Sequence, residues 1–385
     1  MSTIIERDKA FVASTYGRFD VELVKGSGAV LYDSCGKEYI DLGAGIAVNT
    51  FGACDKEWIE AVTAQLNKIQ HTSNLYYTEP CTLLAEKLCE KSGLKKVFFS
   101  NSGAEANECA IKVARKYYAD NHGGAEGEII TLKNSFHGRT VATLKATGQD
   151  VFHKNFGPFP DGFKYCEANN CDELKALVDN RTAAVMIEIV QGEGGVNTLT
   201  KEFIDCIKEL SEKAGFLIVV DEVQTGNGRT GKYFAFQHLC LEPDIVSTAK
   251  GLGGGLPLGA TLLGERVKDT LAAGDHGSTF GGNPVACAGA LSIVDRIDEK
   301  LLKEVAEKGE YIKAKLLKIP KVKSVSGLGL MLGIEIDGDA KQTANECLKK
   351  GVLILTAKSK LRMVPPLNIT FEQIDAAIEI LKECL

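Results

Sequence analysis

Residues 216–250 read FLIVVDEVQTGNGRTGKYFAFQHLCLEPDIVSTAK and contain two short, almost uninterrupted apolar runs. The first run ends at Asp221, and the second ends just before Lys250. Runs of this kind, rich in β-branched residues, are typical of strands that a parallel sheet buries on both faces. Open α/β sheets bind ligands at the carboxyl ends of their strands, so we predict that Asp221 and Lys250 lie together at a binding edge.

Strand-like runs alternate with helical periodicity on either side of this stretch. Further strands are predicted at residues 97–100, 128–132, 183–190 and 260–264, and a helix at residues 201–213. This alternation predicts an α/β fold in which helices cover both faces of a mostly parallel sheet.

The two ends of the chain have a different pattern. Residues 24–43, VKGSGAVLYDSCGKEYIDLG, predict a small antiparallel sheet that turns at Gly28 and Gly36. After residue 283, two helical stretches are followed by alternating strands and a closing helix. We therefore predict a large domain over residues 51–282 and a smaller α+β domain built from residues 1–50 and 283–385.

Composition excludes several classes of protein. The 45 basic and 51 acidic residues give a net charge of −6, and no basic stripe is present to bind nucleic acid. No apolar run approaches the ~20 residues that span a bilayer, and the start of the chain lacks a signal peptide's apolar stretch. The twelve cysteines form no C-x-x-C pair, and the six histidines have no metal-ligand spacing. We expect a cytoplasmic protein with reduced thiols, no metal and neither a membrane nor a nucleic-acid partner.

Two patterns that suggest nucleotide binding fail on detail. Residues 226–232, GNGRTGK, match the spacing of a phosphate-binding loop, but Tyr233 follows where a metal-binding Ser or Thr is needed. The glycine run at 251–255 leads to Pro257 and lacks the third glycine of a dinucleotide fingerprint. Neither pattern predicts a nucleotide site.

The pairing of Asp221 with Lys250 points to another chemistry. A lysine at a strand end can form a Schiff base, and a buried carboxylate can keep a pyridine nitrogen protonated, which is what pyridoxal 5′-phosphate requires. The stretch SNSGAEANE, residues 100–108, predicts a strand-to-helix turn whose free N–H groups at Ser102, Gly103 and Ala104 can bind a phosphate. The alternative is that Asp221 caps a helix and Lys250 is a solvated surface lysine.

Five motifs together resemble the class III pyridoxal-phosphate aminotransferases: SNSGAEANE, SFHGRT, VDEVQTGNGRTG, STAKGLGGGLPLGA and HGSTFGGNPVACA. The resemblance implies the type I fold of pyridoxal-phosphate enzymes and a homodimer with shared active sites. It implies that Lys250 is the Schiff-base lysine and that Asp221 is the partner of the ring nitrogen. The other cofactor contacts that it implies are Gln224 at the ring hydroxyl, Val223 and Phe136 on the two ring faces, Gly103 and Ala104 at the phosphate, and Thr279 of the neighbouring subunit, also at the phosphate.

The same resemblance implies a substrate site. Arg139 corresponds to the carboxylate-binding arginine, Ser278 lies beside the substrate across the dimer interface, and Glu193 lies beside Arg362. An amino acid and a 2-oxo acid that each carry a second carboxylate also need two guanidinium groups to bind their carboxylates. Arg139 and Arg362 can supply these groups. His137 is interpreted as a structural residue.

Within the family, the resemblance favours ping-pong transfer from N2-acetylornithine to 2-oxoglutarate. The products are N-acetylglutamate 5-semialdehyde and glutamate, in a step of arginine biosynthesis. Ornithine, succinylornithine, 4-aminobutyrate and a carrier-linked lysine precursor are alternative donors. Two further alternatives are an aminomutase, which uses the same cofactor in a different class of reaction, and a binding protein without enzymatic activity.

Overall fold

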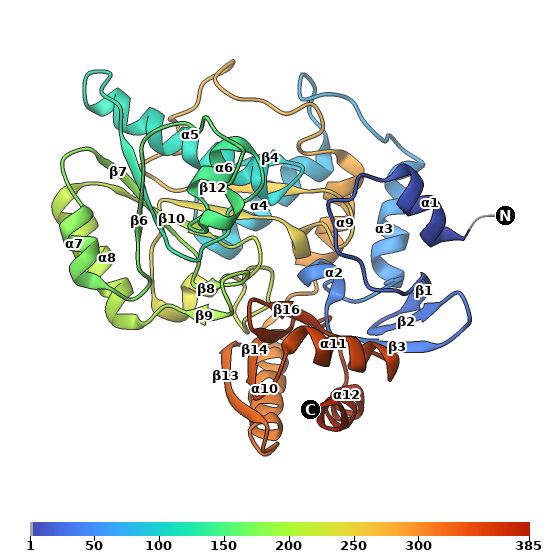
Figure 1. Cartoon of the computed structure of the whole chain (residues 1–385). Coiled ribbons are helices and arrows are strands. Elements are labelled where there is room, and N and C mark those ends of the chain that lie inside the picture. The colour runs from blue at the N-terminus through green and yellow to red at the C-terminus, as the bar shows by residue number, and fades with distance from the viewer. Residues whose placement is uncertain (1–2) are drawn as a thin grey trace.

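A computed structural model describes residues 3–385, and a seven-stranded sheet forms its centre (Figure 1). The spatial order of the strands is β4-β12-β11-β10-β7-β5-β6, and all neighbours are parallel except where β12 meets β11 and β4. These strands are β4 (Lys96–Ser100), β5 (Glu128–Leu132), β6 (Phe163–Cys166), β7 (Thr182–Ile187), β10 (Leu217–Asp221), β11 (Ile245–Thr248) and β12 (Gly259–Leu263). The predicted α/β class and mostly parallel sheet are therefore confirmed.

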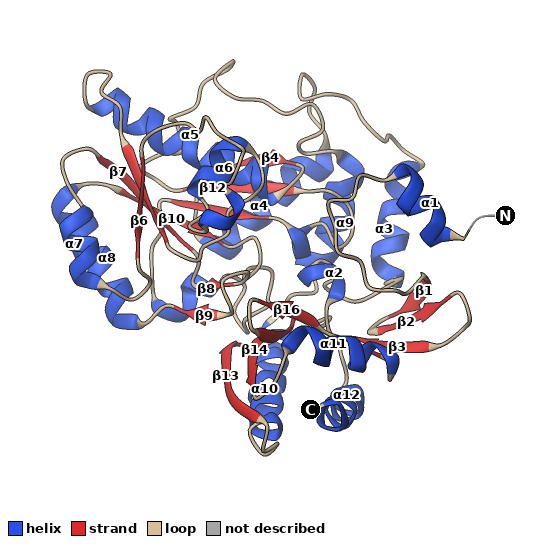
Figure 2. Cartoon of the chain, viewed as in Figure 1, coloured by secondary structure: helices blue, strands red, loops and turns tan. Residues whose placement is uncertain are grey.

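Helices pack on both sides of this sheet, as Figure 2 shows. The longest, α5 (Gly103–Asn121), contacts five of the seven strands. On α8 (Lys201–Ala214), Thr200 caps the first turn and Gly215 ends the helix with φ of 81°. Every residue of β7, β10, β11 and β12 is buried, which agrees with the unbroken apolar runs.

One predicted strand is divided in the structure. The single strand expected over residues 183–190 ends as β7 at Ile187, and the chain resumes as β8 (Val190–Gln191), which pairs with β9 (Asn197–Thr198) in a separate sheet. The prediction of one strand was wrong. At Glu188 the chain leaves the large sheet, because the carboxylate there accepts hydrogen bonds from the N–H groups of Phe136 and Gly192 in two loops.

Two smaller four-stranded sheets are formed by the ends of the chain. The first has the order β1-β2-β3-β15, and its last strand lies parallel to β3 although more than 300 residues separate the two. The second has the order β13-β14-β17-β16. The strands are β1 (Leu23–Ser27), β2 (Val30–Asp33), β3 (Glu38–Asp41), β13 (Val322–Leu328), β14 (Met331–Ile336), β15 (Val352–Leu353), β16 (Leu355–Ala357) and β17 (Lys360–Met363). We propose that both ends of the chain form one smaller domain, and the boundaries at residues 50 and 282 stay a prediction.

The remaining helices lie around these sheets. Helix α9 packs against α3 and α4, and α12 packs against α10 and α11. Their bounds are α1 (Ile4–Phe11), α2 (Ala44–Ala47), α3 (Lys56–Leu66), α4 (Glu79–Ser92), α6 (Val141–Ala146), α7 (Cys171–Leu177), α9 (Pro284–Val294), α10 (Glu299–Leu316), α11 (Ala340–Lys349) and α12 (Phe371–Cys384), with short 3₁₀ turns at Asp150–Phe152, Ala235–Leu239 and Lys250–Leu252. Among residues 3–385, no helix combines the length and the apolar content needed to cross a bilayer.

Candidate active site

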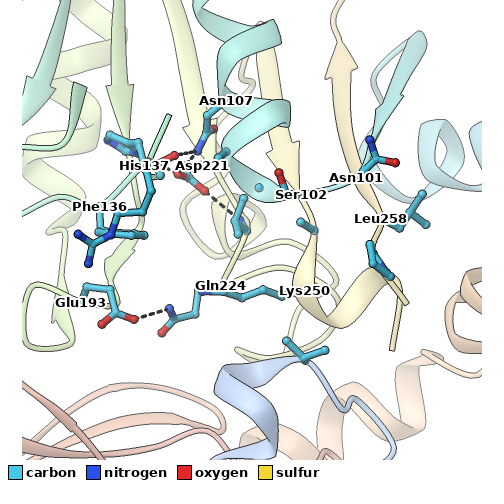
Figure 3. Close-up of a pocket in the computed structure, with 18 of the residues that line it drawn as sticks. Asn101, Ser102, Asn107, Phe136, His137, Glu193, Asp221, Gln224, Lys250 and Leu258 are labelled. Atoms are coloured by element: carbon cyan, nitrogen blue, oxygen red, sulfur yellow. Dashed lines mark hydrogen bonds and ion pairs between the residues drawn. The ribbon is translucent and has the colours of Figure 1, made fainter. Parts of the chain in front are cut away.

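A cavity of about 590 Å³ lies where the predicted site residues converge (Figure 3). Asp221 at the end of β10 and Lys250 shortly after β11 both line it, as the parallel register of these strands requires. Ten of the predicted site residues line the cavity: Ser102, Gly103, Ala104, Phe136, Arg139, Glu193, Asp221, Val223, Gln224 and Lys250.

The carboxylate of Asp221 is buried and accepts three hydrogen bonds. Asn107 Nδ2 donates to Oδ2 over 2.7 Å, His137 Nδ1 lies 2.8 Å from the same oxygen, and the N–H of Val223 donates to Oδ1 over 3.0 Å. These contacts orient the carboxylate toward the cavity and contribute no helix cap, so the helix-capping alternative was wrong.

Two residues hold Asp221: His137, which the sequence interpretation named as a structural residue, and Asn107, which it did not single out. Asn107 comes from α5 and bonds the carbonyl of His137 over 2.8 Å as well as Asp221. His137 is buried; burial alone lowers the pKa of its imidazole, but the hydrogen bond and the charge of Asp221 outweigh this effect and raise it. The interpretation of His137 as a structural residue stays a prediction; the structure places its imidazole at the cavity, in contact with Asp221.

Lys250 begins a 3₁₀ turn and has φ of 44°, in the left-handed region that non-glycine residues rarely adopt. Its side chain is only partly exposed and faces the cavity, so the surface-lysine alternative was wrong. Burial lowers the pKa of its amine, although the negative charge of Glu193 opposes the shift. A buried amine with a lowered pKa is the form that can act as a nucleophile and as a base.

The cavity also receives the N-terminus of α5. Ser102 is the N-cap residue, and its hydroxyl accepts the N–H of Glu105 over 3.2 Å. The N–H groups of Gly103 and Ala104 belong to the first turn, where helical geometry provides no acceptor. A Cβ at Gly103 would lie 2.6 Å from Val223 Cγ1, so only glycine allows this close approach. The turn is therefore shaped to receive an anion beside Val223.

Arg362 reaches the site from β17, a strand that the sequence interpretation did not predict. Its guanidinium is buried and bonds Glu193 over 2.5 Å and Gln224 Oε1 over 3.2 Å. Burial raises the pKa of Glu193, but the charge of Arg362 outweighs burial and lowers it. In this arrangement Glu193 is paired with the guanidinium of Arg362, so a second carboxylate can bind Arg362 only if Glu193 moves away.

Arg139 differs from Arg362 in both its exposure and its partners. It is exposed, its guanidinium lies 4.2 Å from the ring centroid of Phe152 and 5.5 Å from that of Phe136, and no carboxylate of residues 3–385 pairs with it. The site thus presents one arginine that is available to a substrate carboxylate and one that is neutralised.

Ser278 and Thr279 lie outside the cavity in the single chain. Ser278 Oγ accepts a hydrogen bond from Asn101 Nδ2 over 3.1 Å, and Asn101 lines the cavity. Thr279 lines a separate depression together with residues 71–74 and 76–78. Within one subunit, Ser278 and Thr279 therefore do not line the cavity that contains Asp221 and Lys250.

Known proteins resemble this chain over nearly its full length. The model of the class-III aminotransferase family matches residues 11–385. Over 385 residues the chain is 50% identical to the acetylornithine aminotransferase of Haemophilus ducreyi, covering 99% of this chain and 98% of that protein. The chain therefore belongs to the class-III aminotransferase family, as the five motifs predicted.

Solved structures show the same relationship. The ornithine aminotransferase of Toxoplasma gondii, in a crystal structure with partial occupancy of PLP at its active site, has a TM-score of 0.93 and 32% identity, covering 99% of this chain and 93% of that one. The N-acetylornithine aminotransferase of Stenotrophomonas maltophilia has a TM-score of 0.85 and 35% identity, covering 99% of this chain and 98% of that one.

Proposed function

We propose that this protein is a pyridoxal 5′-phosphate-dependent aminotransferase that transfers the amino group of N2-acetylornithine to 2-oxoglutarate. The observation that carries the proposal is the pair of arginines around Lys250: Arg139 is free, and Arg362 is neutralised by Glu193. One arginine suits the carboxylate that both substrates share, and the other suits a carboxylate that only glutamate and 2-oxoglutarate possess.

The residues of the cavity fit pyridoxal 5′-phosphate. The first turn of α5 can hold its phosphate, Val223 and Phe136 its ring, Gln224 its hydroxyl and Asp221 its ring nitrogen, and Lys250 can bond its aldehyde carbon. The close approach of Gly103 to Val223 supports this fit, because it brings the anion site next to a residue expected on the ring. When bound, the cofactor stabilises the negative charge that develops when the substrate carbon loses its proton.

The protein's own groups move and hold the protons. Asp221, fixed by Asn107 and His137, provides the negative charge that retains a proton on the ring nitrogen. Lys250 Nζ would act as the base that takes the proton from the substrate carbon and as the acid that gives it back, a task suited to an amine of lowered pKa. Glu193 covers Arg362 while acetylornithine reacts and must swing away when glutamate or 2-oxoglutarate presents its carboxylate.

The substrate assignment is tested with a panel of amine donors. Acetylornithine, ornithine, succinylornithine, 4-aminobutyrate and lysine are each supplied with 2-oxoglutarate, and glutamate formation is followed. We expect acetylornithine to have the highest kcat/KM. A higher value for another donor would reassign the substrate within the family, and isomerisation of an amine without consumption of 2-oxoglutarate would indicate an aminomutase.

A homodimer is also part of the proposal. Leu75, Tyr76, Tyr77 and Phe280 are between 60% and 99% exposed, and they belong to the two loops that carry residues 71–78 and Ser278–Thr279. Apolar side chains gathered beside residues that we expect to complete a neighbouring site suit an interface with a second copy. The cytoplasmic location stays a prediction.

Arg139→Lys is expected to raise the half-saturation concentrations of both acetylornithine and 2-oxoglutarate by about tenfold, because lysine keeps the charge but loses the two-pronged contact. Steady-state kinetics with each substrate varied in turn measures the effect, and Arg181→Lys, an exposed arginine outside the cavity, is the control. An effect on only one substrate would contradict a shared carboxylate site.

Glu193→Ala is expected to act differently on the two half-reactions. It leaves the glutamate half-reaction unchanged or faster, slows the acetylornithine half-reaction, and shifts donor preference toward α-amino acids by roughly 1 to 3 kcal/mol, the scale of one charge-assisted contact. Single-turnover spectra with each donor measure the effect, and Glu212→Ala, an exposed glutamate, is the control. Equal slowing of both half-reactions would leave Glu193 as a scaffold residue.

A further inference from the structure

Glu188 is a buried carboxylate between two loops of the site, and the chemistry described above does not use it. It follows β7 directly and is 6% exposed. Its Oε2 accepts the N–H of Phe136 over 3.0 Å, and its Oε1 accepts the N–H of Gly192 over 3.3 Å. Each oxygen of one carboxylate therefore holds a different segment of the chain.

The two segments also contact each other through their backbones. A Cβ at Gly194 would lie 2.4 Å from the carbonyl oxygen of Asn134, and the side chain of Gln191 donates to the carbonyl of Lys133 over 2.8 Å. A Cβ at Gly192 would lie 2.5 Å from Gln224 Oε1, so the second segment also runs against Gln224. Loops packed this closely cannot move independently unless the contacts between them are lost.

Both segments carry groups that the substrate and cofactor need. Phe136 and Arg139 lie on the first, and Glu193 follows Gly192 on the second; Figure 3 shows Phe136 and Glu193 at the same side of the cavity. The N–H groups of Phe136 and Gly192 bond two different oxygens of the Glu188 side chain, one each. A carboxylate has two, whereas the amide of glutamine has one and would turn its NH₂ group toward the other donor.

We propose that Glu188 is a positioning residue that couples these two loops. One buried carboxylate then fixes the positions of Phe136 and Arg139 in the first loop and of Glu193, which bonds Arg362, in the second. The kinetic consequences rest on the proposed function, whereas the coupling of the loops does not. Burial raises the pKa of Glu188 to about 7, with the charge of His137 opposing the shift.

The test compares Glu188→Gln with Glu86→Gln, which removes the charge of an exposed glutamate on α4. Hydrogen–deuterium exchange of the holoenzyme is followed in peptides covering residues 133–140 and 190–195, with α8 as an internal reference. We expect exchange in both loops to rise about tenfold together in Glu188→Gln, the scale of one hydrogen bond to a charged group, and to stay unchanged in α8 and in the control. Glu188→Asp, whose shorter side chain cannot span both N–H groups, should reproduce the pattern and provides a second variant if the first does not fold.

Single-turnover kinetics gives a second readout. In Glu188→Gln we expect the half-saturation concentrations of both glutamate and acetylornithine to rise about tenfold while the limiting rates stay within about threefold of the parent protein, because positioning is lost and the reacting groups remain. Faster exchange in one loop alone, in neither loop, or throughout the chain overturns the coupling. A parent protein that is inactive with acetylornithine overturns the proposed function and leaves the exchange measurement to decide the coupling.

Discussion

Lys250→Ala is expected to lower the rate of amino transfer by about 10⁴-fold or more, because the variant loses both the covalent attachment point and the group that moves the proton. The variant should still fold, since the left-handed turn at residue 250 is held by neighbouring backbone contacts and by Thr50, whose hydroxyl donates to the carbonyl of Gly251 over 2.8 Å. Cofactor held by the first turn of α5 and by Asp221 should remain bound without covalent attachment. Rates of glutamate formation and the absorbance of bound cofactor measure the two effects.

The attachment point itself is tested in the parent protein. Borohydride reduction followed by mass spectrometry should label Lys250. The control variant Lys232→Ala, which changes an exposed lysine outside the cavity, should keep full activity. Cofactor found on any other lysine would remove Lys250 from the mechanism.

Asp221→Asn is expected to transaminate at least about 10²-fold more slowly while retaining the fold. An amide has nearly the shape of the carboxylate but cannot hold a positive proton on the ring nitrogen, and a 10²-fold loss corresponds to about 2.7 kcal/mol of transition-state stabilisation. Single-turnover rates with glutamate and with acetylornithine should fall together, since both half-reactions need the same charge stabilisation.

The control for this variant is Asp244→Asn. Asp244 also holds a backbone N–H of the large sheet, that of Ile218 at 2.8 Å, but it precedes β11 and lies outside the cavity. We expect its loss to lower thermal stability and leave the rates unchanged. Near-normal activity of Asp221→Asn would exclude a role for Asp221 in holding the ring proton.

Some functional residues could not be found from the sequence because their role comes from contacts between distant segments. Asn107, His137 and Asp221 are separated by 30 and 84 residues, yet two hydrogen bonds join the first two to one carboxylate oxygen. No periodicity marks such a cluster. Glu188 was similarly placed inside a predicted strand, because an apolar run does not show that a single carboxylate within it will meet two loops.

The sequence by itself determined the mostly parallel sheet, the edge at which the candidate site lies, and the class of chemistry. Buried strands need unbroken apolar runs, and the small residues of SNSGAEANE are needed wherever a helix begins beside an anion, so these features are local and can be recognised in the chain. The positions of Asp221 and Lys250 follow from them, since both side chains come at or just beyond the ends of adjacent parallel strands.

The residues by themselves did not show which charges meet: the resemblance implied that Glu193 lies beside Arg362, and the tertiary structure brings the two side chains together. Arg362 reaches Glu193 because β17 pairs with β14 in a sheet of the C-terminal segment, and a hydrogen bond from the N–H of Val364, directly after β17, to the carbonyl of Leu42 joins this segment to the other end of the chain. Whether an arginine is free, as Arg139 is, or neutralised, as Arg362 is, depends on which carboxylate lies within about 4 Å of it. That distance is set by the fold as a whole, because no local pattern encodes the contact between Arg362 in β17 and Glu193 in the turn between β8 and β9.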